Sequence, residues 1–242
     1  MRDILDNFNQ YFEMIPALSD ELKEEVYKLR FQVYCNETGF EDPALCPKNM
    51  EHDEYDDNSI HYLIKHRTSK SYAATTRLIM PDDDNIDKLL PIEQHTCIED
   101  YEILKGIPRE NIAEVSRFCV SNKFKRRINF LTGIGTEEPK EVSLKEKITF
   151  PHITLALIAC LIKASDEQHI TYWFAIMEPA LLRFLSIVGI RFTDIGPVIE
   201  YHGKRKPCVI KISDLLDGVL QKNESLWNML TDNGRVGTKL SR

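Results

Sequence analysis

Apolar residues near the start of the chain recur every three or four positions, which is the spacing of one face of an α-helix. Ser19 is a residue type favoured at helix N-termini, and it directly precedes this pattern. We therefore expect a helix over about residues 19 to 37, with Arg30 at the border of its apolar face. The residues of that face are Leu22, Val26, Leu29 and Val33.

Strand patterns follow an acidic, proline-bearing loop over residues 38 to 58. Residues 59 to 66 and 72 to 80 are rich in β-branched and aromatic side chains, and the turn-forming segment HRTSKS between them predicts a hairpin. A short helical stretch near residues 92 to 105 comes before a third predicted strand, which covers residues 114 to 120.

Helical and strand patterns alternate in the second half of the chain, and this order predicts an α+β fold with a mixed sheet covered by helices. No repeat or clean linker interrupts the chain, so we expect one domain over residues 1 to 242, with a core of about residues 11 to 214 and a helical tail over about 213 to 231. The predicted elements are helices over 151 to 168 and 178 to 188, and strands over 171 to 177, 191 to 194 and 208 to 212.

Composition narrows the classes of function. The 242 residues are 43% hydrophobic and 29% charged, as in ordinary globular proteins, and the formal net charge of −7 disfavours nucleic acid or an anionic membrane as a partner. The polar N-terminus lacks the apolar region of a secretory signal, and no apolar run approaches the roughly 20 residues of a transmembrane helix. We expect a cytoplasmic protein without a transmembrane segment.

The six cysteines show neither a C-x-x-C pair nor the spacing of metal ligands, so we expect reduced thiols and no metal site. Nucleophilic catalysis is also disfavoured. Cys119 lies in a predicted buried strand, where cysteine is usually inert, and Ser116 lacks the G-x-S-x-G motif of a nucleophilic serine.

The predicted strand AEVSRFCVS carries two charges, Glu114 and Arg117, at positions where burial without a partner costs several kcal/mol. Regular alternation places Glu114 and Arg117 on opposite faces, whereas a β-bulge changes that parity and turns a backbone N–H out of the ladder. Two interpretations stay open: a buried ion pair between Arg117 and a carboxylate of the acidic loop, or a functional site.

Other charges occur where an apolar residue would suit the fold. The acidic loop contains EHDEYDD, which taken alone is typical of a solvated surface, and Arg77 ends a strand. Together with Arg30 and Arg117, these residues predict a pocket with both signs of charge. Such a pocket suits a zwitterionic or amine-bearing ligand, because carboxylates bind an ammonium group and arginines bind a carboxylate.

Basic residues follow the charged strand in the segment SNKFKRR, and a second cluster is formed by Lys204, Arg205 and Lys206. A solvated surface is the ordinary explanation of such clusters, but the position of the first one beside the charged strand favours contact with a phosphate or an acidic protein. No aromatic residues interleave with these cations in the manner of a nucleic-acid site.

Six segments resemble a known family. LRFQVYC, EHDEYDDNSIHYLI, TTRLI, EVSRFCVS, AIMEPALLRFLSIVGI and EYHGKRKPC look like the acyltransferases of PEP-CTERM/exosortase systems. Those enzymes are relatives of the acyl-homoserine-lactone autoinducer synthases and the N-acyl amino acid synthases in the GNAT-like superfamily. The resemblance extends from about residue 11 to residue 231.

The resemblance implies a mostly antiparallel sheet that splays into a V between the strand of Glu114 and the strand of Trp173. The donor's pantetheine would lie in this opening, and a bulge would aim an amide at the thioester carbonyl. It implies catalytic roles for Glu51, Glu114 and Arg117. It also implies that substrate contacts come from Arg30, Asp53, Asp56, Arg77, Ser116, Phe118, Val120 and Trp173.

The implied reaction is N-acylation, in which an amine attacks an acyl thioester while Glu51 or Glu114 removes its proton. No permanently bound cofactor is expected; the donor is the acyl-phosphopantetheine of acyl carrier protein, or acyl-CoA, and the acceptor is an amino acid or similar small amine. Acetyl-CoA-dependent relatives follow this strand with a glycine-rich loop that is missing here. This difference favours acyl carrier protein, bound by Lys123, Lys125, Arg126 and Arg127.

A second class of function remains an alternative. A non-catalytic GNAT-like module could bind acyl carrier protein or an acyl ligand and regulate a partner. The full set of arginines and carboxylates favours the enzyme, since a binding module has no need to keep them beside one strand.

Overall fold

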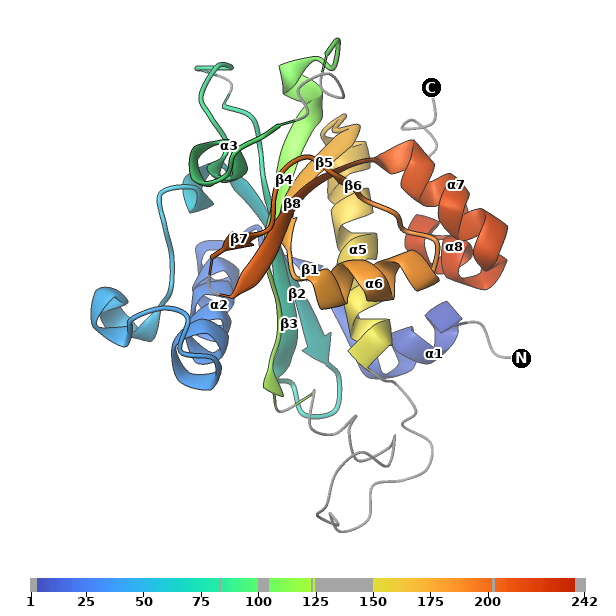
Figure 1. The fold of residues 1–242 in the computed structure, drawn as a ribbon. Helices are drawn as coiled ribbons and strands as arrows, with labels where there is room; N and C mark the ends of the chain where they lie inside the picture. The colour runs from blue at the N-terminus through green and yellow to red at the C-terminus, as the bar shows by residue number, and fades with distance from the viewer. Residues whose placement is uncertain are drawn as a thin grey trace. The chain divides into compact units, whose positions relative to one another are not determined.

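Figure 1 shows the computed structural model, which describes residues 4–82, 84–99, 105–122, 124, 150–201 and 203–237. The strands form an open, mostly antiparallel sheet flanked by helices, as expected from the sequence. They hydrogen-bond in the order β1-β2-β3-β4-β5-β8-β6, and β7 pairs with β8. The strands are β1 Phe12–Pro16, β2 Ser59–His66, β3 Tyr72–Ile79, β4 Ile112–Val120, β5 Tyr172–Met177, β6 Thr193–Asp194, β7 Ile199–Glu200 and β8 Lys204–Lys211.

Seven α-helices are described, together with short segments of other helix types. The α-helices are α1 Ile4–Tyr11, α2 Asp20–Phe31, α3 Pro91–His95, α5 Phe150–Glu167, α6 Pro179–Ile187, α7 Ile212–Lys222 and α8 Glu224–Thr231. The π-helix η1 covers Gln32–Glu37, and the 3₁₀ turns are η2 Pro43–Leu45, η3 Pro47–Asn49, η4 Asp56–Asn58 and η6 Arg109–Asn111. Within the described parts of the chain, no helix has the length and apolar character needed to cross a membrane.

The chain forms two compact units. Strands β2, β3 and β4 and helix α5 contribute residues to both, and the expectation of a single domain stays a prediction. The first unit contains Met1–Asp53, His61–Thr76 and Arg117–Cys160, and the second contains Glu54–Ile60, Arg77–Ser116 and Leu161–Arg242.

The core of the first unit forms around the predicted helix at the N-terminal side. Ser19 caps α2, because its side-chain oxygen accepts a hydrogen bond from the Leu22 N–H at 3.4 Å. Val26, Leu29 and Val33 pack with Leu63 and Cys119, so the apolar face predicted from the sequence is buried. After Phe31 the helix widens into the π-helix η1, where Thr38 N–H bonds to the Val33 carbonyl five residues earlier at 3.0 Å.

The core of the second unit forms around β5 and β8, which are antiparallel neighbours. Phe174 and Val209 pack there with Ile112 of β4. The parallel pairing of β4 with β5 extends from Ile112 opposite Tyr172 to Val115 opposite Ala175 and ends there, although β4 continues to Val120. The sheet therefore changes its pairing at the charged part of β4.

Several elements differ from the sequence prediction. The N-terminal α1 and β1 were not predicted, and neither was β7, which is only two residues long. Strand β8 begins at Lys204, four residues earlier than the expected start at residue 208. Pro207 lies opposite Ile176 in the ladder with β5 and just beyond the two residues that pair with β6.

Gly189 follows the end of α6, and both its backbone conformation and the space around it suit only glycine. Its φ is +100°, and a Cβ atom added to it would lie 2.2 Å from the carbonyl oxygen of Gly218. Gly189→Ala should therefore lower the stability of the protein by about 2 to 4 kcal/mol, seen as a fall in the urea midpoint.

Gly106→Ala is the matched control, since Gly106 has a φ of +80° but open space around the position of a Cβ atom. It should cost only about 1 to 2 kcal/mol, the penalty of the backbone conformation alone. Equal losses in the two variants would contradict the close contact of Gly189 with Gly218.

Candidate functional site

An arginine and a glutamate of the first unit form a buried, two-pronged ion pair. Arg30 from α2 donates from Nε to Glu51 Oε2 at 2.5 Å and from Nη2 to Glu51 Oε1 at 3.0 Å. The Glu51 backbone N–H donates to the Tyr27 carbonyl at 3.1 Å, which ties the acidic loop to α2. A planar guanidinium matches a carboxylate in this way, so the pair fixes the orientation of both groups.

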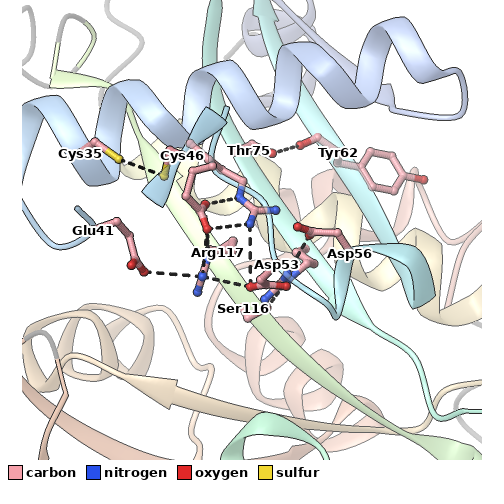
Figure 2. A network of polar contacts seen from close by, with 12 residues as sticks. Cys35, Glu41, Cys46, Asp53, Asp56, Tyr62, Thr75, Ser116 and Arg117 are labelled. Carbon is pink, nitrogen blue, oxygen red and sulfur yellow. Dashed lines mark hydrogen bonds and ion pairs between the residues drawn. The ribbon is translucent and has the colours of Figure 1, made fainter. Parts of the chain in front are cut away.

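Arg117 of β4 joins the same carboxylate from the other side. Its Nη2 donates to Glu51 Oε1 at 3.0 Å and to Asp53 Oδ2 at 3.0 Å, and lies 3.6 Å from Glu41 Oε1. Figure 2 shows the Arg117 guanidinium with Glu41 and Asp53 around it. The ion pair that the sequence left as one interpretation is present. We call Arg30, Glu41, Glu51, Asp53 and Arg117 the arginine–carboxylate network.

The two guanidinium groups determine the charge state of Glu51. Burial raises the pKa of Glu51, but hydrogen bonds and charge attraction from Arg30 and Arg117 outweigh burial and hold that pKa at about 2. Glu51 is therefore ionised at neutral pH and is a weak base. Burial lowers the pKa of Arg117, but the combined attraction of Glu51, Tyr34 and Asp53 outweighs burial and the repulsion of Arg30, and the pKa lies above its usual range.

The network is graded from a buried end to an accessible end. The Arg30 and Glu51 side chains are 0% and 5% exposed, whereas Arg117, Asp53 and Glu41 are 19%, 24% and 30% exposed. Three carboxylates against two guanidinium groups leave a formal charge of −1. The accessible end therefore offers carboxylates to an ammonium group and an arginine edge to a carboxylate.

Two tyrosines flank the arginines and were missed in the sequence. The Tyr27 ring centre lies 5.5 Å from Arg30 Cζ, and the Tyr34 ring centre lies 5.6 Å from Arg117 Cζ. Burial raises the pKa of Tyr34 well above its usual value, so its phenol stays neutral. Positions 27, 30 and 34 have helical spacing, which was the available signal.

The backbone of β4 is irregular at Arg117, whose φ is +47°. A left-handed conformation in a non-glycine residue costs of order 1 kcal/mol and is uncommon inside a strand. Such residues occur in β-bulges, where the alternation of side chains is interrupted. The sequence raised a bulge as the means of turning an amide out of the ladder, and the conformation of Arg117 is of the kind that does so.

A second buried ion pair belongs to the second unit. Arg77 of β3 donates from Nη1 to Asp56 Oδ1 at 2.7 Å and from Nε to Ser116 Oγ at 2.9 Å. The Tyr55 ring centre lies 6.0 Å from Arg77 Cζ. Three residues expected at the substrate, Asp56, Arg77 and Ser116, are therefore brought together.

Glu114 is buried in the second unit, where its Oε2 accepts a hydrogen bond from the Ile92 N–H at 2.8 Å. Ile92 lies in the first turn of α3, so a short helix holds this carboxylate in place. Trp173 is fully buried, and its indole N–H donates to Ser165 Oγ at 2.8 Å. The contact of Trp173 with substrate stays a prediction, as do those of the half-buried Phe118 and the buried Val120 of the first unit.

Glu37 is another residue that the sequence did not indicate. Its Oε2 accepts a hydrogen bond from the Asn122 N–H at 2.7 Å, and its Oε1 accepts one from Gln32 Nε2 at 2.7 Å. Ser121 Oγ also accepts from Gln32 Nε2 at 3.0 Å. The π-helix therefore holds the chain where it leaves β4, within the first unit.

Of the two basic clusters expected from the sequence, the structure describes only the second. The predicted carrier-binding residues Lys123, Lys125, Arg126 and Arg127 lie outside the described residues. In the second cluster, Arg205 Nη1 lies 2.7 Å from Glu178 Oε1, and Lys206 forms an ion pair with Asp194. Two of its three cations thus have acidic partners. No group of three or more metal-ligating side chains is arranged around a common point in the described ranges.

The low pKa of Glu51 makes a prediction about acid stability. Because the folded pKa lies near 2 and the ordinary value is 4.5, the stabilisation by Glu51 is complete above about pH 4.5 and is lost as the pH falls toward 2. Glu51→Gln should destabilise the protein at pH 7 by about 3 to 5 kcal/mol, because the buried Arg30 loses the carboxylate that hydrogen-bonds to it and keeps only the more distant charge of Asp53, at 3.9 Å. Urea titrations at pH 7 and pH 3 measure both effects.

The control is Glu25→Gln, which removes a carboxylate 2.9 Å from Lys28 on the exposed side of α2. A surface pair of this kind contributes less than about 1 kcal/mol. If Glu51→Gln were no more destabilising than Glu25→Gln, or kept the wild-type fall in stability between pH 4.5 and 2, the role assigned to Glu51 would be wrong.

Comparison with known proteins gives a family match and a set of similar folds. The Acetyltransferase (GNAT) domain family matches residues 29–132, a segment that contains both buried ion pairs and Glu114. A search of curated proteins found no match. The match covers less than half of the chain, so it concerns this segment.

Three solved structures illustrate the similarity of the fold. The AHL synthase LasI has a TM-score of 0.57 at 18% identity, over 87% of this chain and 97% of its own. BjaI, a CoA-dependent acyl-homoserine lactone synthase, has a TM-score of 0.56 at 17% identity, over 92% and 88%. FeeM, an N-acyl amino acid synthase from uncultured soil microbes, has a TM-score of 0.53 at 14% identity, over 86% and 94%. At these identities the likeness establishes the fold: the chain has the GNAT-like fold of these synthases.

Proposed function

We propose that this protein is an N-acyltransferase that moves a fatty acyl group from an acyl carrier protein thioester to the amine of an amino acid or similar small acceptor. The observation that carries the proposal is the arginine–carboxylate network, which lies inside the GNAT-matched segment. A purely structural role would be served at lower cost by apolar packing, because buried ion pairs gain little stability over well-packed hydrophobic residues.

The accessible end of the network suits the acceptor. Its carboxylates, Asp53 and Glu41, can bind the ammonium group of an amino acid. The Arg117 side chain is partly exposed, so its guanidinium can also attract the acceptor's carboxylate. Tyr34 and Glu51 hold Arg117 in place, so the acceptor meets a site that is already ordered.

Of the two carboxylates considered as the base, Glu114 is the better candidate. A base with a pKa of about 2 has little tendency to take a proton from an ammonium group, and Glu51 is occupied by two arginines. We therefore assign Glu51 as a positioning residue for Arg30 and Arg117. Glu114 takes the proton, directly or through water, while its contact with Ile92 fixes its orientation.

The chemical step needs no covalent enzyme intermediate. The acceptor nitrogen attacks the thioester carbon, the new C–N bond forms, and the C–S bond breaks to release the carrier thiol with a proton. The negative charge that develops on the carbonyl oxygen requires backbone donors. The left-handed Arg117 and the end of the β4–β5 pairing at Val115 favour such donors on this strand, an effect of roughly 3 to 4 kcal/mol per donor in well-studied enzymes.

Acyl carrier protein is preferred as the donor on grounds of sequence. The segment after β4 is basic and lacks the glycine-rich loop of acetyl-CoA-dependent relatives, and carrier proteins present acidic surfaces. The similar synthase BjaI is described as CoA-dependent, so acyl-CoA is the competing donor to be tested. We assign the reaction to the cytoplasm, while the link to PEP-CTERM/exosortase systems stays a prediction.

The reaction is tested with purified protein, a mixture of acyl carrier protein thioesters of different chain lengths, and the common amino acids. Mass spectrometry should detect N-acyl products together with the release of free carrier thiol. Glu114→Gln should lower the rate about 100-fold or more, since it removes the base but leaves an oxygen to accept the Ile92 N–H.

Glu110→Gln changes an exposed glutamate four residues earlier and should leave the rate unchanged. A Glu114→Gln enzyme with wild-type rate would show that another group is the base. Tight carrier binding without any N-acyl product would instead support the non-catalytic module.

The identity of the donor is tested with variants that reverse charges in the basic segment that follows β4. Lys125→Glu with Arg126→Glu should raise the KM for the carrier-bound donor about 10-fold and weaken its dependence on salt, because electrostatic steering is lost. The KM for a short acyl-pantetheine, which lacks the carrier, should not change. Lys204→Glu, at an exposed position in the second cluster, is the control. Unchanged KM and salt dependence in the double variant would contradict carrier binding by this segment.

A further inference from the structure

Two cysteines of the first unit lie in contact. Cys35 Sγ is 3.7 Å from Cys46 Sγ, and the dashed line between them is visible in Figure 2. Cys35 lies on the π-helix and is buried, whereas Cys46 lies between η2 and η3 and is partly exposed. Both are free thiols, and they are separated by eleven positions in the sequence.

Hydrogen bonds of the intervening loop bring the two sulfur atoms together. The N–H groups of Phe40 and Glu41 both donate to the Tyr34 carbonyl, at 2.8 and 3.1 Å, which folds the loop back on the π-helix. The Asp42 side chain then accepts from the Ala44 N–H at 2.9 Å and starts the turn η2 that leads to Cys46. The contact thus follows from an ordered loop.

We propose that Cys35 and Cys46 form a reversible disulfide with a low-molecular-weight disulfide as the oxidant. A disulfide bond is about 2.05 Å long, so the sulfur atoms have to approach each other by roughly 1.7 Å. Disulfides in cytoplasmic proteins, the location that we propose, are usually transient and redox-sensing.

The difference in exposure sets the order of the steps. Cys46 reacts first: its sulfur attacks the small disulfide, a mixed disulfide forms, and the leaving small thiolate takes up the Cys46 proton. The Cys35 sulfur then attacks the Cys46 sulfur, and the second small thiolate leaves and takes up the Cys35 proton, directly or through water. In sum, two protein thiols are oxidised and one small disulfide is reduced to two thiols.

Cys35 is protected from reacting on its own. Burial, together with its hydrogen bond to Cys46, raises the pKa of Cys35 to about 12, so it remains a thiol at neutral pH. Once Cys46 carries the mixed disulfide, Cys35 acts as the resolving cysteine and attacks the Cys46 sulfur.

The disulfide would act on the accessible end of the arginine–carboxylate network. The loop that it closes carries Glu41, whose Oε1 lies 3.6 Å from Arg117 Nη2. Closing the loop restricts the movement of Glu41 and of the residues around it. The redox state of the chain is thereby connected to the site where we expect the acceptor.

The test uses the full-length protein and oxidised glutathione, followed by alkylation and peptide mass spectrometry without reduction. We expect a cross-linked peptide that joins Cys35 to Cys46 and a protein mass lower by two hydrogens, both reversed by dithiothreitol. The oxidised protein should unfold at a temperature about 5 °C higher, because the bond constrains the unfolded chain.

Matched variants identify the pair. Cys46→Ser should abolish the cross-link, and Cys97→Ser, which removes an exposed thiol elsewhere, should leave it intact. A stable glutathione adduct on Cys46 with Cys35 still reduced would overturn the proposal, as would a cross-link to any other cysteine. These readouts do not require acyl transfer, so they stand or fall independently of the proposed function.

Discussion

The carboxylate of Glu51 is the group on which the first unit depends, because it pairs with two arginines that come from different elements. Arg30 is fully buried on α2, and Arg117 lies on β4, and Glu51 hydrogen-bonds to both, with Asp53 as a further charge partner of each. The same contact explains why the acidic loop is folded onto α2 through Tyr27. One side chain thus orders a helix, a loop and a strand around a charged group.

An ion pair of this kind changes the basicity of the carboxylate that takes part in it. A carboxylate held by two guanidinium groups is well oriented but has lost most of its basicity, whereas Glu114 is held by a backbone amide. The second unit repeats the arrangement with Asp56, Arg77 and Ser116. In the proposed reaction the fixed ion pairs orient the acceptor, and proton transfer is assigned to Glu114, a carboxylate outside them.

Much of this arrangement could be predicted from the sequence. Apolar periodicity gave α2, the hairpin of β2 and β3, and α5 close to their observed bounds, because each buries a continuous face in a local pattern. The charges at positions 30, 77, 114 and 117 stood out because they lie in or beside apolar segments, whereas Glu51 was indicated by the acidic loop and the family resemblance. The sequence suggested that Arg117 pairs with the acidic loop but not with which carboxylate, since ion pairs such as Arg117 with Asp53 join residues distant in sequence.

Other features leave little trace in a single sequence. The left-handed backbone at Arg117 is set by tertiary context, since arginine has no preference for it. Glu41 looked like one of many loop acids, and only the folding of the loop onto Tyr34 brings it to Arg117. Strand β1 is too short to show a pattern and is defined by its pairing with β2.

The π-helix after α2 has a consequence for how this chain can vary. A π turn amounts to one residue more than an α-helix needs, and each residue rotates the following side chains by about 100° around the axis. Deleting a single residue from Gln32–Glu37 would restore a regular helix and swing everything after it to another side. Glu37 would then point away from the end of β4, and Cys35 from its sulfur neighbour. A change in the length of this stretch would therefore break several contacts at once, whereas a substitution affects only the contacts of one side chain.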